Sequence, residues 1–279
     1  MELIFTVAEF KKAIEIQKFQ GKKIGFVPTM GALHKGHLSL VQKAGEETNF
    51  VVVSIFVNPN QFNNKEDLAR YPRNLEADRE VLKPTPCNLI FAPSVSEVYP
   101  EEDKRVFDFG NLGNVMEGLH RTGHFNGVAQ VVSRLFDMVQ PHRAYFGMKD
   151  FQQLAIINNM VEQLKLPVKI IPCPIVREPD GLAMSSRNVL LSSEQRSNAA
   201  LISKTLFEAV RRAEKFSVNE VKQWVVDTIN QNPYLRTEYF DIVDDQQLES
   251  VESWNEPCNK IGCIAVHCGK VRLIDNITF

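Results

Sequence analysis

Two hydrophobic periods alternate along the chain and predict strands and helices in turn. Residues 50–57, Phe-Val-Val-Val-Ser-Ile-Phe-Val, form an almost continuously apolar run, which is typical of a strand buried on both faces of a parallel sheet. In residues 125–139 the apolar side chains recur every three or four positions, which predicts a helix with one buried face. The alternation of these two patterns indicates an α/β protein.

The predicted elements divide the chain into two parts. We expect strands at residues 3–6, 24–27, 50–57, 88–91, 144–146 and 168–171, with helices at 7–18, 38–48, 74–83, 125–139 and 151–164. Further on we expect helices at 193–215 and 218–231, and strands at 238–243, 262–267 and 270–274. This order predicts a Rossmann-like, doubly wound parallel sheet domain over residues 1–176, followed by a smaller α+β domain over residues 177–279.

The composition of the chain argues against nucleic acids and membranes as its partners. The 279 residues are 44% hydrophobic and 24% charged, as in ordinary globular proteins. The net charge of -2 argues against nucleic acid as the main partner, because binding to phosphate backbones needs a surplus of basic residues. The sequence contains no apolar run of about 18 residues and no signal segment, so we expect a cytoplasmic protein without membrane contact.

The five cysteines fit reduced thiols better than disulfides, because their number is odd and none forms a Cys-x-x-Cys pair. Cys258, Cys263 and Cys268 are spaced by five residues, and a zinc site is one interpretation of that spacing. However, Cys263 falls within a predicted strand. We therefore expect these cysteines to be small core residues.

Residues 28–37, Pro-Thr-Met-Gly-Ala-Leu-His-Lys-Gly-His, join a predicted strand to a predicted helix. The free N–H groups and positive dipole end of a helix N-terminus favour a phosphate. His34 and His37 are three residues apart, so both imidazoles can face one ligand and donate hydrogen bonds to it. We expect Gly36 to leave room for a phosphate near the backbone. The alternative is a capped helix whose histidines face solvent.

Polar residues also follow three other predicted strands. In an open parallel sheet, ligands bind beyond the carboxyl ends of the strands, so these residues are expected to converge. They are Asn58 and Gln61; Gly147, Met148, Lys149, Asp150 and Gln153; and Val176 with Met184, Ser185, Ser186 and Arg187. Each group has a simpler interpretation, because Asp150 can be a helix cap and residues 185–188 can be an ordinary turn. No Gly-x-Gly-x-x-Gly fingerprint or Walker lysine loop is present.

The His34-Lys-Gly-His37 element, with the later Met184-Ser185-Ser186-Arg187, resembles the paired signatures of the nucleotidyltransferase superfamily. More narrowly, the chain is similar to the pantothenate synthetase (pantoate–β-alanine ligase) family. The matching segments are PTMGALHKGHLSLV, FVNPNQF, YPR, GHFNGVAQVV, FGMKDFQQL and REPDGLAMSSRN.

The resemblance implies an ATP- and Mg²⁺-dependent ligation in two steps. Pantoate would attack the α-phosphate of ATP to give pantoyl adenylate and pyrophosphate, and the amine of β-alanine would then displace AMP. It also implies a homodimer. Adenylation suits this chemistry, because a carboxylate is a poor acylating agent and a reactive anhydride must be shielded from water.

The resemblance also implies a role for each matching residue. His37, His34, Lys149 and Arg187 would be catalytic, Asn58, Gln61, Gln153, Val131 and Val132 would bind pantoate and β-alanine, and Asp78 would bind the metal. ATP would contact Met30, Gly31, Ala32, Leu33, His34, Lys35, Gly36, His37, Gly147, Met148, Lys149, Asp150, Val176, Met184, Ser185, Ser186 and Arg187.

Two other functions compete with this one. A related adenylyltransferase would keep the nucleotide on its product, and the neutral amides of Gln61 and Gln153 argue against it. A non-catalytic nucleotide sensor would have lost a histidine or lysine of the site, and the sequence retains them.

Overall fold

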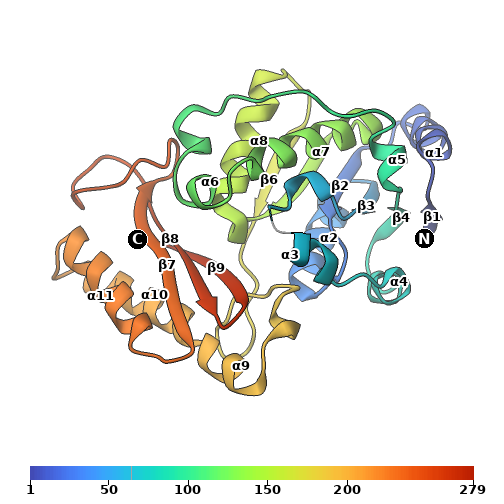
Figure 1. Cartoon of the computed structure of the whole chain (residues 1–279). Coiled ribbons are helices and arrows are strands. Elements are labelled where there is room, and N and C mark those ends of the chain that lie inside the picture. Colours follow the sequence, from blue (N-terminus) through green and yellow to red (C-terminus); the bar gives the residue numbers. More distant parts are fainter. Residues whose placement is uncertain (64) are drawn as a thin grey trace.

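Six parallel strands form the larger of two sheets, in the order β1-β4-β3-β2-β5-β6 (Figure 1). The computed structural model describes residues 1–63 and 65–279. The strands are β1 (Glu2–Ile4), β2 (Ile24–Thr29), β3 (Phe50–Ile55), β4 (Cys87–Phe91), β5 (Arg143–Gly147) and β6 (Lys169–Cys173). The predicted parallel sheet is therefore confirmed.

Side chains leave this sheet alternately toward two separate apolar cores. Along β3, Val52 packs in the core on one face, whereas Val51 and Val53 pack in the core on the other. Along β2, Phe26 and Val27 divide between the two faces in the same way. Because successive side chains of a strand point to opposite faces, a run that is apolar throughout needs both faces covered.

Helices cover both faces, as the predicted doubly wound layer requires. Helices α1 (Val7–Phe19), α7 (His124–Val139) and α8 (Phe151–Gln163) pack on one face, and α2 (Lys35–Glu47) and α4 (Leu75–Leu82) on the other. Short helices were not predicted, because so few residues carry little periodicity. They are α3 (Lys65–Arg70), α5 (Val95–Val98), α6 (Met116–His120) and the 3₁₀ turns η1 (Pro59–Gln61), η2 (Gly110–Gly113), η3 (Met148–Asp150) and η4 (Asn188–Leu190).

The C-terminal unit combines a three-stranded antiparallel sheet with helices, as predicted. We use this term for α9 (Ser193–Ala199), α10 (Leu201–Arg212), α11 (Val218–Asn230), β7 (Leu235–Asp244), β8 (Lys260–Cys268) and β9 (Val271–Thr278). The prediction of one helix over residues 193–215 is wrong. The chain instead makes a turn at Ala200, where φ is -63° and ψ is -17°, close to 3₁₀ values, so that α9 and α10 are separate helices.

The cysteines of the C-terminal unit pack in or against the apolar core, as predicted. Cys263 and Cys268 are buried, Cys258 is partly buried, and all three are free thiols. Within residues 1–63 and 65–279, no group of three His, Cys, Asp or Glu side chains is arranged to hold a metal ion. None of the helices in this part of the chain has the length and apolar character needed to cross a membrane.

The C-terminal unit packs against the helices of the six-stranded sheet through a shared apolar core and an ion pair. Val243 and Ile261 belong to the same core as α7 and α8. Beside them, the guanidinium of Arg272 donates to both oxygens of Glu117 at 2.7 and 2.8 Å, and the hydroxyl of Tyr239 donates to Glu117 at 2.7 Å. Burial raises the pKa of Glu117, but Arg272 outweighs it and brings that pKa to about 2.

The Glu117–Arg272 pair predicts an acid-sensitive contribution to stability. Because the pKa of Glu117 falls from 4.5 to about 2 on folding, its contribution is complete above pH 4.5 and is lost as the pH falls toward 2. The shift corresponds to about 3 kcal/mol in the free energy of unfolding. Glu117→Gln should therefore lower stability at pH 7 and change it much less at pH 3, as measured by urea unfolding. The exposed pair Glu208–Arg211 supplies a control, Glu208→Gln, which should show no such pH dependence. Equal losses for Glu117→Gln at both pH values would contradict this role.

Candidate active site

A pocket of about 230 Å³ opens at the carboxyl ends of the large sheet. The strand order reverses between β2 and β5, which is where open parallel sheets bind ligands. Most of the predicted site residues line this pocket, although they come from four separate loops and from the helices α2, α7 and α8. They are Met30, His34, Gly36, His37, Asn58, Gln61, Val131, Val132, Gly147, Lys149, Asp150, Gln153, Val176, Met184, Ser185, Ser186 and Arg187.

His34 and His37 lie at the start of α2 with their rings 4.1 Å apart. The Nδ1 atom of His34 accepts a hydrogen bond from the backbone N–H of Gly36 at 3.1 Å, and Nδ1 of His37 accepts one from the N–H of His34 at 3.3 Å. A nitrogen that accepts a hydrogen bond carries no proton, so the proton of each neutral ring is on Nε2. The two histidines cap the helix through Nδ1 and keep an Nε2–H donor for a ligand.

Both imidazoles are neutral at pH 7. Burial, followed by the charge of Lys149, lowers the pKa of His34 to about 4. Burial, the neighbouring His34 and Lys149 lower the pKa of His37 to about 3. A neutral imidazole with its proton on Nε2 keeps one hydrogen-bond donor for an anion.

The structure gives a packing reason for glycine at position 36. A Cβ at this position would lie 2.8 Å from Cε1 and 2.9 Å from Nδ1 of His34. Glycine is therefore needed at position 36 so that His34 can fold back onto its own helix. Gly36 also lines the pocket, and its predicted role of leaving room for a phosphate stays a prediction.

Asp78, on α4, holds the loop that leads to the histidines. It is only 3% exposed, and its carboxylate accepts hydrogen bonds from the N–H groups of Ala32 at 3.0 Å and Leu33 at 2.7 Å. Gly31 has φ of +81°, and a Cβ there would lie 2.8 Å from Asp78 Oδ2. Burial raises the pKa of Asp78, and the two backbone bonds oppose that rise. Asp78 does not line the pocket, and its observed partners are the loop amides. The magnesium ion that the sequence predicted as its partner stays a prediction.

Other predicted ATP-binding residues lie beside the pocket rather than in its lining. Lys35 is exposed at the first position of α2. The carbonyl of Ala32 accepts a hydrogen bond from Ser186 Oγ at 3.0 Å. The residues of this set that the pocket lining does not include are Gly31, Ala32, Leu33, Lys35 and Met148.

The loop with Ser185–Ser186–Arg187 crosses from the end of β6 to the opposite wall of the pocket. Arg177 and Ala183 form an antiparallel bridge at its base, and Ser186 bonds to Ala32 as described above. Arg187 donates to Asp67 of α3 at 2.9 Å and lies over the ring of Tyr71. The loop therefore closes one side of the pocket and places a guanidinium there.

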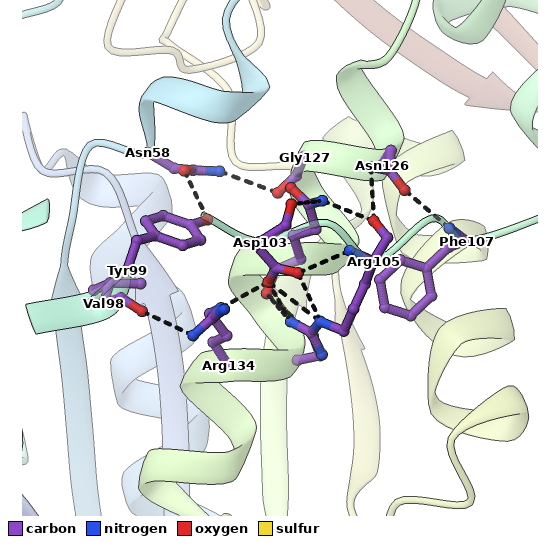
Figure 2. Close-up of polar contacts among 11 residues, drawn as sticks. Asn58, Val98, Tyr99, Asp103, Arg105, Phe107, Asn126, Gly127 and Arg134 are labelled. Atoms are coloured by element: carbon purple, nitrogen blue, oxygen red, sulfur yellow. Dashed lines mark hydrogen bonds and ion pairs between the residues drawn. The ribbon is translucent and has the colours of Figure 1, made fainter. Parts of the chain in front are cut away.

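Amide groups form another part of the pocket lining, which we call the amide wall. Asn58 is 1% exposed, and its Nδ2 donates to Gln61 Oε1 at 3.2 Å and to the carbonyl of Gly127 at 3.1 Å. The hydroxyl of Tyr99 donates to Asn58 Oδ1 at 3.0 Å (Figure 2). Gln61 also contacts the sulfur of Met30 at 3.1 Å. Asn58 thus fixes the orientation of Gln61, and no part of this wall is charged.

A buried charge cluster holds the neighbouring segment against α7. Asp103 accepts hydrogen bonds from Arg105 and from Arg134, both at 2.6 Å (Figure 2). These two arginines keep the pKa of Asp103 well below its usual range, although burial opposes them. Tyr99, which orients Asn58, lies four residues earlier and is covered by the guanidinium of Arg134. The Asp103–Arg134 pair therefore holds Tyr99 in place, and Tyr99 in turn orients Asn58 in the amide wall.

Sequence reasoning missed two residues of the site. Tyr71 lines the pocket, and the only sequence signal for it is its place in the Tyr-Pro-Arg segment. Asp67 binds Arg187, but nothing in its local sequence distinguishes it from an ordinary helix carboxylate. His124, at the start of α7, is buried, and its Nδ1 lies 2.8 Å from the carbonyl oxygen of Gln61.

The pocket offers two kinds of chemistry side by side. The neutral donors of His34 and His37, with the cations Lys149 and Arg187, suit a polyphosphate. The amides of Gln61 and Gln153, next to Val131 and Val132, suit a small molecule with both polar and apolar groups.

Comparisons with known proteins point to one family. The profile of the Pantoate-beta-alanine ligase family matches residues 2–278. A pantothenate synthetase of Porphyromonas gingivalis is 53% identical over 279 residues, covering 100% of this chain and 99% of the relative. The crystal structure of pantothenate synthetase from Thermus thermophilus has a TM-score of 0.92 at 45% identity, with 99% of each chain covered. A pantoate–β-alanine ligase of Francisella tularensis, complexed with beta-gamma ATP and β-alanine, has a TM-score of 0.83 at 34% identity, covering 100% of this chain and 97% of that one.

The histidine geometry predicts a specific NMR signature. Long-range ¹H–¹⁵N correlation spectra should show His34 and His37 as neutral Nε2–H tautomers from pH 8 down to pH 5, because their pKa values are about 4 and 3. Lys149→Ala should raise both pKa values, since the charge of Lys149 lowers them. Removing an exposed lysine on β6, in Lys169→Ala, should leave both unchanged. An Nδ1–H tautomer, or protonation near pH 6.5, would refute the assigned geometry.

Proposed function

The chain belongs to the pantoate–β-alanine ligase family, and we propose that its pocket carries out the family's ATP-dependent joining of pantoate to β-alanine. The product is pantothenate, formed through a pantoyl-adenylate intermediate with release of pyrophosphate and AMP. The observation that carries this proposal is the convergence, in one pocket, of phosphate-binding donors with an uncharged amide wall.

The first step joins two anions. An oxygen of the pantoate carboxylate attacks the α-phosphorus of ATP, and the bond from that phosphorus to the bridging oxygen breaks, so that pyrophosphate leaves. Negative charge grows on the phosphate oxygens in the transition state, and fixed donors aimed at it lower the barrier. We assign this task to Nε2–H of His34 and His37, with Lys149 as the nearby cation.

The second step consumes the adenylate. The amine of β-alanine attacks the acyl carbon, the bond from that carbon to the AMP oxygen breaks, and the amine loses a proton as the amide forms. A mixed anhydride of this kind is readily hydrolysed, so water must be kept away from it. The loop bearing Ser185, Ser186 and Arg187 supports such shielding, because Ser186 already bonds to Ala32 across the pocket.

The substrates are assigned to different parts of the pocket lining. We place ATP along Met30, Gly147, Asp150, Val176 and the two serines, with its phosphates toward the histidines, Lys149 and Arg187. We place pantoate against Gln61 and Gln153, with its methyl groups on Val131 and Val132. Asn58 acts through Gln61, because its amide fixes the orientation of that side chain.

Four further expectations belong to this proposal. We propose that Mg²⁺ enters with the phosphates of ATP, where it would supply charge neutralisation. Asp78 stays a predicted ligand only, because it lies outside the pocket lining and each of its oxygens accepts a hydrogen bond from a loop amide. We also propose that residues 1–176 and 177–279 act as two domains, an assignment supported by their separate sheets. A homodimer and a cytoplasmic location stay predictions.

Removing a phosphate donor should affect the adenylation step. We expect His37→Ala and Lys149→Ala each to lower the rate of pantoate-dependent exchange between ATP and labelled pyrophosphate by about 10²- to 10³-fold. His142 is exposed and does not line the pocket, so His142→Ala serves as the control and should keep the wild-type rate. Exchange that does not depend on pantoate would refute the proposed reaction, and a near-full rate in either variant would remove the role given to that residue.

Removing one side chain of the amide wall should act on pantoate alone. Because Gln61→Ala deletes a hydrogen-bonding partner in a buried wall, we expect the KM for pantoate to rise about 10-fold or more while the KM for ATP stays within about twofold. Steady-state kinetics of the full reaction measure both constants, with Gln163→Ala at the end of α8 as the control. An unchanged KM for pantoate would place pantoate elsewhere.

A further inference from the structure

One residue of the C-terminal unit holds the turn that carries Lys149. The side-chain amide of Asn276, on β9, donates hydrogen bonds to the carbonyls of Met148 at 2.8 Å and Lys149 at 2.9 Å. Asn276 is 6% exposed, so both bonds are shielded from water. A single NH₂ group therefore satisfies two consecutive carbonyls of a chain segment about 127 residues away in sequence.

Lys149 lies in a turn too short to fix its own backbone through regular helix or strand hydrogen bonds. It sits in the three-residue turn η3 between β5 and α8. Its ammonium lies 4.0 Å from Asp150, and in the described part of the chain it makes no hydrogen bond. The position of the ammonium is therefore set by the backbone of the turn and by side-chain packing. The bonds from Asn276 fix that backbone.

The neighbouring residue on β9 holds a second element of the site. Asp275 is 4% exposed and accepts hydrogen bonds from Arg177 at 2.6 and 3.0 Å. Arg177 also donates to the carbonyl of Gly181 at 3.1 Å, at the base of the loop that carries Ser185, Ser186 and Arg187. Two adjacent residues of one strand thus hold the two segments that carry the cations of the pocket. Asn276 binds the turn with Lys149, and Asp275 acts through Arg177 on the loop with Arg187.

Two consecutive buried polar residues are unusual in a strand, because successive side chains normally point to opposite faces. In β9 the backbone N–H of Asn276 donates to Asp275 Oδ1 at 2.8 Å, so this side chain folds back along the strand. Burying polar groups costs free energy unless they are hydrogen-bonded, and here the bonds are made to the active-site loops. In the described part of the chain, the only hydrogen bond that these two side chains make within the C-terminal unit is the one from the N–H of Asn276 to Asp275.

We propose that Asn276 is a positioning residue for Lys149, and that with Asp275 it fixes the Lys149 turn relative to the Arg187 loop. The C-terminal unit therefore sets the spacing of the two cations that bind the phosphates. The catalytic part of this inference rests on the function proposed above for Lys149, whereas the positional part does not.

The test uses Asn276→Leu, which keeps the branched shape and the number of side-chain heavy atoms and removes both hydrogen bonds. We expect kcat for pantoate-dependent ATP–pyrophosphate exchange to fall about 10- to 100-fold, because a displaced catalytic group loses rate steeply with distance. The KM for pantoate should stay within about twofold. In a Lys149→Ala background, Asn276→Leu should change the rate by less than about twofold, since the group it positions is already gone. Multiplying losses in the double variant would overturn the proposal.

A second readout does not depend on activity. Because Lys149 lowers the pKa values of His34 and His37, displacing it in Asn276→Leu should raise both pKa values in the NMR titration, in the same direction as Lys149→Ala. Unchanged pKa values in a folded Asn276→Leu variant would refute the positioning role. If the wild-type chain showed no pantoate-dependent exchange, the proposed function would fail, while this titration would still decide the role of Asn276.

Asn232→Leu is the matched control. Asn232 also donates a side-chain hydrogen bond, to Asn198 Oδ1 at 2.8 Å, but it does so within the C-terminal unit and away from the pocket. We expect it to keep the wild-type kcat and histidine pKa values. Circular dichroism and thermal unfolding of each variant report whether it is folded, and Asn276→Ala offers a smaller side chain should the leucine not be accommodated.

Discussion

The active site depends on one buried carboxylate, that of Asp78, and its two bonds to the amides of Ala32 and Leu33. The loop from β2 to α2 passes through positive φ at both Gly31 and Ala32, a conformation that an unsupported chain rarely adopts. Without this acceptor, the two partly buried amides would lose their hydrogen-bond partner, at a cost of up to about 1–3 kcal/mol each. The placement of His34 and the anchor for Ser186 on Ala32 both follow from this loop.

The same loop determines the chemical state of the histidines. Because backbone N–H groups point at both Nδ1 atoms, the protons are held on Nε2, and burial keeps the rings uncharged. A neutral donor fixed in this way stabilises charge that develops during reaction without reorganising itself. The fold thus supplies electrostatic stabilisation from neutral groups and leaves the full positive charges to Lys149 and Arg187.

Local patterns in the sequence predicted the strands of the large sheet, the convergence of residues at their carboxyl ends and most of the pocket lining. They failed where a residue's role depends on a distant partner. Asp78 contacts a loop about 45 residues away, and Arg187 pairs with Asp67 across the pocket. Gly36 makes room for the ring of His34, a contact that its local sequence did not indicate. Periodicity reports which face of an element is buried, and it carries no information on which polar groups meet.

The ion pair between Arg187 and Asp67 has a consequence for nucleotide affinity. A guanidinium that already has a carboxylate partner gains from a phosphate only the difference between the two interactions. If Arg187 binds a phosphate as proposed, one anion would replace another there, and Asp67 would compete with the phosphate for the guanidinium. Such competition would weaken nucleotide binding and favour product release.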